Sequence, residues 1–174
     1  GPDAIKIAAL DYGSNLFNKL HSIEVPVENN LLFETHGSTY AKRIRGIVGI
    51  YDRLSKTVAD VLKAKEFPII LAGDHSTAGG TIAGIKMANP KARLGVIWID
   101  AHADLHSPYT TPTGNVHGMP LAATLGEDNI ANKMNKPDKE TVDLWNKLKK
   151  IGGISDLRLS IKLAFSKPAL AFIS

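Results

Sequence analysis

Three side chains that commonly bind metal ions occupy alternate positions in one short stretch of the sequence. Asp100, His102 and Asp104 follow the continuous apolar run 94–99, Leu-Gly-Val-Ile-Trp-Ile. Such a run is typical of a strand buried on both faces of a parallel sheet. If the strand geometry persists, alternate residues share one face, and their crowded carboxylates need a cation to offset desolvation. The pattern predicts a metal site at the carboxyl end of this strand.

A second polar cluster follows another apolar run. Residues 67–72, Phe-Pro-Ile-Ile-Leu-Ala, predict a second buried strand, and Gly73-Asp74-His75-Ser76 follows it. Sequential strands usually lie side by side, and sites gather beyond the carboxyl ends of parallel strands. We therefore expect His75 beside Asp100, His102 and Asp104, a ligand set that suits manganese, iron, zinc or nickel. A lone Asp-x-His would be a solvated turn, but the combination after two strands favours a metal site.

The elements that would position these residues follow from hydrophobic periodicity and turn residues. We expect helices over residues 40–65, 120–125 and 137–150, and strands over residues 5–10, 67–72 and 94–99. Ser76 can cap the segment 77–87. The glycines of this segment could suggest a phosphate-binding loop, but no Gly-Lys-Ser/Thr follows them, so we expect them to allow close helix packing. Gly126 is expected to close the short helix before it. The alternation of strands and helices predicts an α/β fold with a parallel sheet.

The end of the sequence has a different pattern from the rest. From Leu157 to Phe165 apolar residues alternate with polar or small ones, which is typical of a half-exposed strand. No linker or internal repeat divides the chain. We therefore expect a single domain over residues 1–174, with an atypical tail over residues 154–174.

Composition excludes several classes of function. The formal charge of +4 is mild and the lysines are scattered, so binding to nucleic acid or to an anionic membrane is not indicated. The absence of cysteine excludes disulfides, zinc-thiolate clusters and cysteine nucleophiles. No apolar run approaches the roughly 20 residues that span a bilayer, and no signal-peptide pattern is visible. A cytoplasmic protein is the default expectation.

Together, these motifs resemble a known family. Gly73-Asp74-His75-Ser76 and Asp100-Ala101-His102-Ala103-Asp104 resemble the first two metal motifs of the ureohydrolases: arginase, agmatinase and formiminoglutamase. The stretch 110–118, Thr-Thr-Pro-Thr-Gly-Asn-Val-His-Gly, resembles arginase most closely among them. The resemblance is specific over about residues 44–125. It implies a three-layer α/β/α fold with a mostly parallel sheet, and a binuclear Mn²⁺ centre whose bridging hydroxide attacks a guanidinium carbon.

The resemblance also implies roles for individual metal ligands. His75 and Asp104 match ligands of one manganese ion, His102 a ligand of the other, and Asp100 a bridge between them. Cations about 3.5–4 Å apart demand carboxylates that can be shared. L-arginine, cleaved to ornithine and urea, is the leading guanidino substrate, with agmatinase or formiminoglutamase chemistry as the alternative.

Other residues match positions around the substrate. His117 resembles the histidine assigned to proton transfer, although a loop histidine bonded to backbone would look the same. Thr111, Thr113 and Asn115 match positions of the amino-acid recognition loop, and ordinary turn chemistry explains them nearly as well. His106 stands where arginases usually carry an asparagine that contacts the substrate carboxylate, and an imidazole can still donate a hydrogen bond there.

One family motif is absent from this sequence. The third metal motif, Ser-x-Asp-x-Asp, has no counterpart, because no Asp-x-Asp pair follows Asp104. We therefore expect the amino-terminal portion of a truncated arginase-like domain, with one metal ion or none and impaired hydrolysis. A non-catalytic remnant that keeps the fold and a partial metal site is the alternative. Self-association into a homo-oligomer would cover an open sheet edge.

Overall fold

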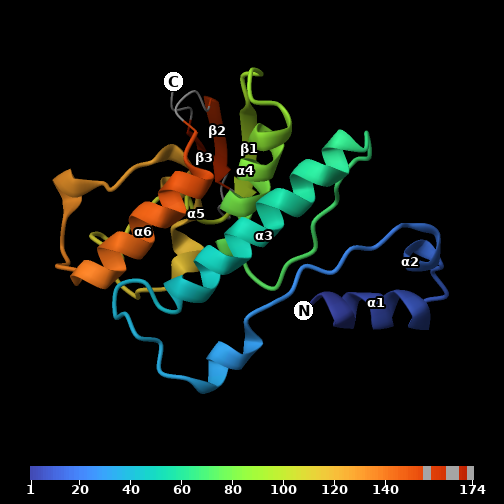
Figure 1. Cartoon of the computed structure of the whole chain (residues 1–174), viewed down its shortest axis with the longest axis horizontal. Coiled ribbons are helices and arrows are strands. Elements are labelled where there is room, and N and C mark those ends of the chain that lie inside the picture. The colour runs from blue at the N-terminus through green and yellow to red at the C-terminus, as the bar shows by residue number, and fades with distance from the viewer. Residues whose placement is uncertain (155–157, 164–168, 172–174) are drawn as a thin grey trace.

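The computed structural model describes residues 1–154, 158–163 and 169–171 (Figure 1). Its α-helices are α1 (Pro2–Asp11), α2 (Leu16–Lys19), α3 (Ile44–Lys63), α4 (Ala78–Ala88), α5 (Pro120–Leu125) and α6 (Lys139–Gly152). Its short 3₁₀ helices are η1 (Asn29–Phe33), η2 (His75–Thr77), η3 (Val116–Gly118) and η4 (Ile130–Asn132). Its strands are β1 (Gly95–Asp100), β2 (Arg158–Leu163) and β3 (Ala169–Ala171). No helix of these ranges is long and apolar enough to cross a membrane.

The sheet confirms the strand predicted over residues 94–99 and a strand within the stretch 157–165, of which residues 157, 164 and 165 and the predicted half-exposure lie outside the described part of the chain. β1 pairs in parallel with β2, with register from Gly95 opposite Arg158 to Asp100 opposite Leu163, and β2 pairs antiparallel with β3. The prediction that β1 is buried on both faces is wrong. Trp98 is buried, whereas Ile97 and Ile99 are 79% and 74% exposed, because α4 and α5 pack over one face of the strand only.

The long amphipathic helix predicted over residues 40–65 is confirmed as α3. Its apolar residues recur at intervals of three and four, so they form one stripe that faces α4 and α6. Tyr51 is fully buried at the centre of this stripe and belongs to the same apolar cluster as Trp145 of α6. A second cluster joins Ile82 of α4, Trp98 of β1 and Leu121 of α5. These two clusters form the core that supports the end of β1.

The two later helices are also confirmed. α5 begins at Pro120 and ends at Leu125, and the next residue, Gly126, adopts the left-handed conformation (φ +73°) expected of a glycine that ends a helix. α6 begins after Asp138 and ends at Gly152. The expected cap at Ser76 is wrong: the carboxylate of Asp74 accepts a hydrogen bond from the Ser76 backbone N–H (2.9 Å) and so caps η2. Asp74 takes this role because it precedes the turn, and its carboxylate oxygen can reach the otherwise unpaired backbone N–H of Ser76 two residues later.

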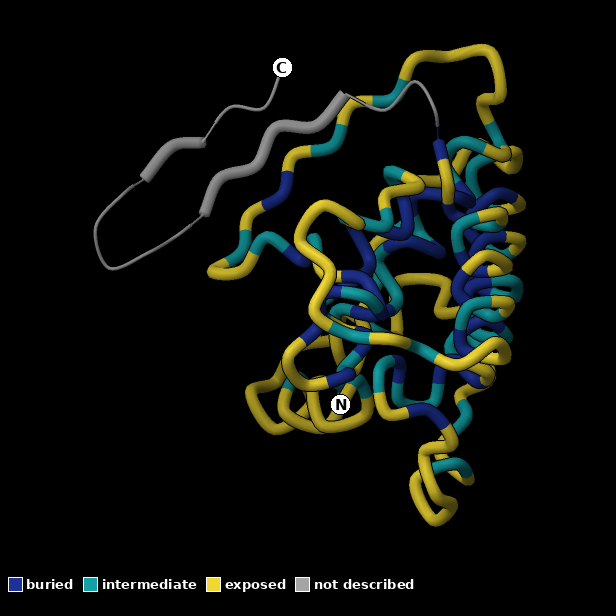
Figure 2. The backbone as a smooth tube through the Cα atoms, turned by 90° about the vertical axis from the view of Figure 1, so that its left-hand side faces the viewer, coloured by how far each residue is buried: buried dark blue, intermediate teal, exposed yellow. Residues whose placement is uncertain are grey.

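Two predicted strands are wrong. Residues 5–10 lie in α1, none of whose residues is buried, and Figure 2 shows that the whole segment before α3 is largely exposed. A segment without a strand partner satisfies its backbone hydrogen bonds internally by forming a helix, and Pro2 favours a helix start there. Residues 67–72 are not assigned to any strand, and Phe67 and Ile69 are 86% and 73% exposed. Apolar composition alone indicated these strands, but it does not provide a neighbour to pair with.

Asp138 should contribute to stability in a pH-dependent way. Its carboxylate accepts a hydrogen bond from the Thr141 backbone N–H (2.7 Å), and this bond, with the Thr141 hydroxyl, lowers the pKa of Asp138 below its ordinary value. Asp138→Ala is therefore expected to cost about 1 kcal/mol of unfolding free energy at neutral pH. A lowered folded-state pKa means that this contribution is present above the unfolded pKa and is lost as the pH falls through the folded pKa.

Denaturant unfolding of both proteins at neutral pH and at about pH 3 measures this effect. The stability gap between wild type and Asp138→Ala should shrink at the lower pH. Asp138→Asn is the matched control, because asparagine also caps helices but does not titrate. A gap between wild type and Asp138→Ala that stays constant with pH would contradict the ionic character of the cap.

Candidate metal centre

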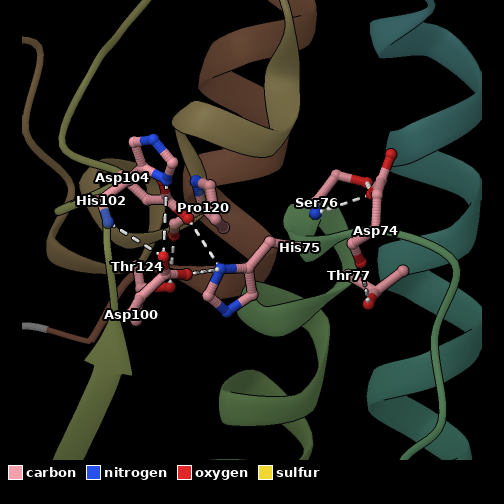
Figure 3. A network of polar contacts seen from close by, with 9 residues as sticks. All are labelled: Asp74, His75, Ser76, Thr77, Asp100, His102, Asp104, Pro120 and Thr124. Carbon is pink, nitrogen blue, oxygen red and sulfur yellow. Dashed lines mark hydrogen bonds and ion pairs between the residues drawn. The ribbon is translucent and has the colours of Figure 1, made fainter. Parts of the chain in front are cut away.

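The structure brings three of the predicted ligands together at the carboxyl end of β1 (Figure 3). His75 comes from η2, Asp100 is the last residue of β1, and Asp104 lies in the loop that follows. His75 Nδ1 lies 2.7 Å from Asp100 Oδ2 and 2.8 Å from Asp104 Oδ2. One ligand atom from each of the three residues falls within 4.8 Å of the others. Of the residues described, these three form the group whose spacing suits a shared ion.

Asp104 does not join this group by continuing the strand, although the alternate spacing of Asp100, His102 and Asp104 predicted that it would. β1 ends at Asp100, and Asp104 adopts a left-handed backbone conformation (φ +51°), which aspartate tolerates better than most residues. Its carbonyl oxygen accepts hydrogen bonds from the backbone N–H groups of Leu121 and Ala122 (both 3.2 Å) at the start of α5. A turn anchored on α5 therefore carries the buried Asp104 carboxylate back toward His75.

The two carboxylates are in different electrostatic environments. Although partial burial acts in the opposite direction, the backbone N–H of His102 and the imidazole of His75 lower the pKa of Asp100 below its ordinary value. Burial raises the pKa of Asp104, and although His75 opposes this, the neighbouring Asp100 carboxylate adds to it. Two carboxylates and one imidazole this close together are stabilised by a positive charge between them.

These residues fit a divalent cation. One imidazole nitrogen and two carboxylate oxygens are a mixed nitrogen and oxygen donor set, which suits Mn²⁺, Fe²⁺ or Zn²⁺. Asp104 is only 7% exposed, and a buried carboxylate beside a second one is costly unless a cation accompanies it. The chemistry of the donor set therefore matches the metal site predicted from the sequence.

His102 lies at the rim of this group. Its side chain is 82% exposed, and its Nδ1 lies 3.5 Å from Asp100 Oδ1, whereas its backbone N–H donates to the same oxygen at 2.9 Å. His117 of η3 is also exposed. The metal-site residues line a shallow, open pocket of about 280 Å³, formed by Asp74, His75, Asp100, His102, Asp104 and His117.

The residues expected to contact substrate lie outside this pocket lining. The Thr111 hydroxyl accepts from the Gly114 backbone N–H (2.9 Å), and the Thr113 hydroxyl accepts from the Asn115 backbone N–H (3.2 Å). The His106 ring lies 3.4 Å from the Thr110 hydroxyl. The threonine hydroxyls therefore stabilise the turn of the loop, which is the structural alternative that the sequence left open.

Two supporting residues had no assigned role in the sequence. Asp128 Oδ1 accepts hydrogen bonds from Trp145 Nε1 (2.7 Å) and Lys149 Nζ (2.6 Å), while its carbonyl oxygen accepts from the Ser107 hydroxyl. Asp128 thus attaches the loop after Asp104 to α6. Trp98 stacks on His75, with ring centroids 4.3 Å apart. No spacing signal predicts either contact, because each joins segments at least 17 residues apart.

The sequence profile of the arginase family matches residues 1–142, which is well over half of the 174 residues. The chain belongs to the arginase family. The matched region contains every residue of the candidate metal centre, and arginase-family membership agrees with the ureohydrolase resemblance of the motifs around His75 and Asp100.

Several arginases are similar to this chain. Arginase from Bacillus caldovelox is 36% identical over 128 residues, which cover 72% of this chain and 42% of that protein. Arginase from Bacillus subtilis (strain 168) is 47% identical over 85 residues, which cover 49% of this chain and 28% of that protein. The chain therefore spans less than half the length of these relatives.

Solved arginase structures have a similar fold. The crystal structure of arginase from Bacillus subtilis subsp. subtilis str. 168 has a TM-score of 0.62 at 30% identity, covering 92% of this chain and 50% of that one. Entamoeba histolytica arginase in complex with L-ornithine has a TM-score of 0.56 at 31% identity, covering 81% and 43%. These arginase-family structures support an α/β arginase fold for the chain.

Proposed function

We propose that this chain supplies metal ligands of an arginase-type hydrolase that cleaves a guanidino C–N bond, with Mn²⁺ as the cofactor and L-arginine as the leading substrate. The observation that carries the proposal is the convergence of His75, Asp100 and Asp104 in a chain of the arginase family. The complex of a similar arginase with L-ornithine supports a substrate of this size and type. The finer architecture, a three-layer α/β/α domain with a mostly parallel sheet, belongs to the same proposal.

Each residue has a chemical role in this proposal. His75, Asp100 and Asp104 would hold the cation, which when bound would supply Lewis-acid activation for hydrolysis. His102, on the rim, lies close enough to Asp100 to orient its carboxylate. His117 lines the same pocket, and an imidazole there could donate a proton to the leaving amine. In the balanced reaction, water adds to the guanidino carbon, the C–N bond breaks, and the departing nitrogen gains a proton.

Substrate recognition is assigned to the loop 106–115. We propose that the side chains of His106, Thr113 and Asn115 contact the amino-acid end of the substrate, because His106 and Thr113 are exposed and Asn115 is partly exposed. Thr111 is buried and its hydroxyl is engaged with Gly114, so its contribution is to hold the loop in shape. Agmatine and formiminoglutamate lack the free α-amino and α-carboxylate pair of arginine. Assaying hydrolysis of all three compounds therefore separates the arginase, agmatinase and formiminoglutamase reactions.

The test combines metal binding with product formation. Calorimetric titration of the purified chain with Mn²⁺ should give about one ion per chain, since one three-ligand group is present in the described residues. Urea release from L-arginine should be slow but above that of an Asp100→Ala control. Two tight Mn²⁺ sites would contradict the single-ion centre. Urea at or below the control level would contradict hydrolysis by this chain.

A second candidate function is metal binding without hydrolysis. The exposure of the His102 side chain favours it, because the three converging ligands leave this histidine outside the group. Tight binding of one Mn²⁺ ion, without urea from arginine or agmatine and without formamide from formiminoglutamate, would support this candidate over the hydrolase.

A further inference from the structure

Trp98 stands against one face of the His75 ring. The indole and imidazole centroids lie 4.3 Å apart, and the ring planes are inclined by 22°, which is a stacked arrangement. Trp98 is held in place by the apolar cluster of Ile82, Leu121 and Ile154, and is 4% exposed. His75 is far less constrained, because 39% of its side chain is exposed. A rigid aromatic surface therefore supports a ring that is otherwise partly open to solvent.

The His75 ring lacks the usual restraint on its orientation. Histidine ligands generally donate their second ring N–H to a carboxylate or carbonyl group, which fixes the ring plane and tautomer. In the described part of the chain, both polar contacts of His75 are made by Nδ1, to Asp100 and Asp104, and Nε2 has no hydrogen-bond partner. The stack with Trp98 supplies the restraint on the ring plane, because turning the imidazole out of this plane would break the ring contact, while the contacts of Nδ1 with Asp100 and Asp104 select which ring edge faces the carboxylates.

The strand sets the position of this aromatic surface relative to the ligands. Trp98 and Asp100 are two residues apart on β1, so their side chains leave the strand on the same side. An imidazole stacked on Trp98 is thereby placed beside the Asp100 carboxylate. In addition, the buried Trp98 Nε1 has no hydrogen-bond partner among the described residues, which is a cost that phenylalanine or leucine at this position would avoid. Core packing alone does not explain a tryptophan here.

We propose that Trp98 is a positioning residue for the metal ligand His75, holding the imidazole so that Nδ1 faces Asp100 and Asp104. This inference rests on the proposed function, because it concerns the affinity of the same centre for a divalent cation. It predicts that the loss of the aromatic surface weakens metal binding without removing any ligand. The size of the effect should resemble that of removing a hydrogen-bond partner of a ligating histidine, which is about 10-fold or more.

The experiment measures Mn²⁺ affinity by calorimetry for wild type, Trp98→Phe, Trp98→Leu and Ile82→Val. Trp98→Leu should bind about 10-fold more weakly, and Trp98→Phe should retain most of the affinity because a smaller ring still stacks. Ile82→Val is the matched control, since it trims the same apolar cluster but removes neither a ligand nor the aromatic ring, and it should leave the affinity unchanged. Circular dichroism establishes that each variant is folded before titration.

A metal-free readout tests the stack itself. The indole ring current should shift the imidazole proton resonances of His75, assigned by their loss in His75→Gln, and this shift should disappear in Trp98→Leu. Wild-type affinity in folded Trp98→Leu, or an equal loss of affinity in Ile82→Val, would overturn the positioning role. The absence of Mn²⁺ binding by the wild type would instead refute the proposed function on which the role depends.

Discussion

Asp104→Asn is expected to lower the affinity of the chain for Mn²⁺ by about 100-fold or more, since removing even a residue outside the ligand set commonly costs 10–100-fold. The substitution replaces a carboxylate oxygen 2.8 Å from His75 Nδ1 with a neutral amide and leaves the volume almost unchanged. Asparagine also tolerates the left-handed backbone at this position (φ +51°), so the fold should persist. Calorimetric titration, with the thermal midpoint of the metal-free protein as a folding check, measures the outcome.

Asp74→Asn is the matched control for Asp104→Asn. Asp74 lines the same pocket, but Figure 3 shows its carboxylate directed toward Ser76, away from the group formed by His75, Asp100 and Asp104. The control removes the same charge from the same pocket, and asparagine remains a good cap for η2. It should therefore weaken Mn²⁺ binding far less. Equal losses in the two variants would mean that pocket charge, rather than coordination by Asp104, determines the affinity.

Gly114→Ala is expected to destabilise the protein by about 2–4 kcal/mol, the largest stability effect among the substitutions considered. Gly114 adopts a positive φ of +75°, and a Cβ atom added there would overlap the carbonyl oxygen of Thr39. The surrounding backbone cannot easily move, because the Gly114 carbonyl accepts a hydrogen bond from the Lys42 backbone N–H (2.8 Å). Denaturant unfolding measures the loss, and displacement of the loop should also reduce any urea release.

Gly126→Ala separates the two causes of that loss. Gly126 has nearly the same φ (+73°), but a Cβ atom added there meets nothing within 4 Å. Its replacement should therefore cost only the backbone strain, about 1 kcal/mol. If Gly114→Ala costs no more than Gly126→Ala, the close approach of the loop to Thr39 does not contribute to stability.

Helices α3, α5 and α6 were predictable from local signals. The period of three to four in α3, the proline that begins α5, the glycine after α5 and the aspartate before α6 all act within a few residues of the sequence. The apolar run 94–99 correctly indicated β1. The runs 5–10 and 67–72 have similar composition, yet neither forms a strand. A strand requires a partner, and partner choice depends on residues that lie far away in the sequence.

The sequence predicted which residues belong to the candidate site better than it predicted how they are arranged. The motifs around His75 and Asp100 brought together residue types that suit a cation, and three of them converge. Alternate spacing suggested that His102 would share their face, but β1 ends at Asp100 and the His102 side chain is 82% exposed. The left-handed turn at Asp104, held by the first N–H groups of α5, depends on a helix that begins 16 residues later.

The amino-acid sequence by itself determined which residues can bind a metal ion, that α3, α5 and α6 are helical, and the family to which the motifs belong. These properties follow from side-chain chemistry and local backbone preference. Only the tertiary structure decided which ligands meet, how Trp98 supports His75 and how Asp128 attaches the loop to α6. Each of these contacts joins segments that are far apart in the sequence. The packing of α3, α4, α5 and α6 brings these segments together, and this packing is a property of the whole folded core.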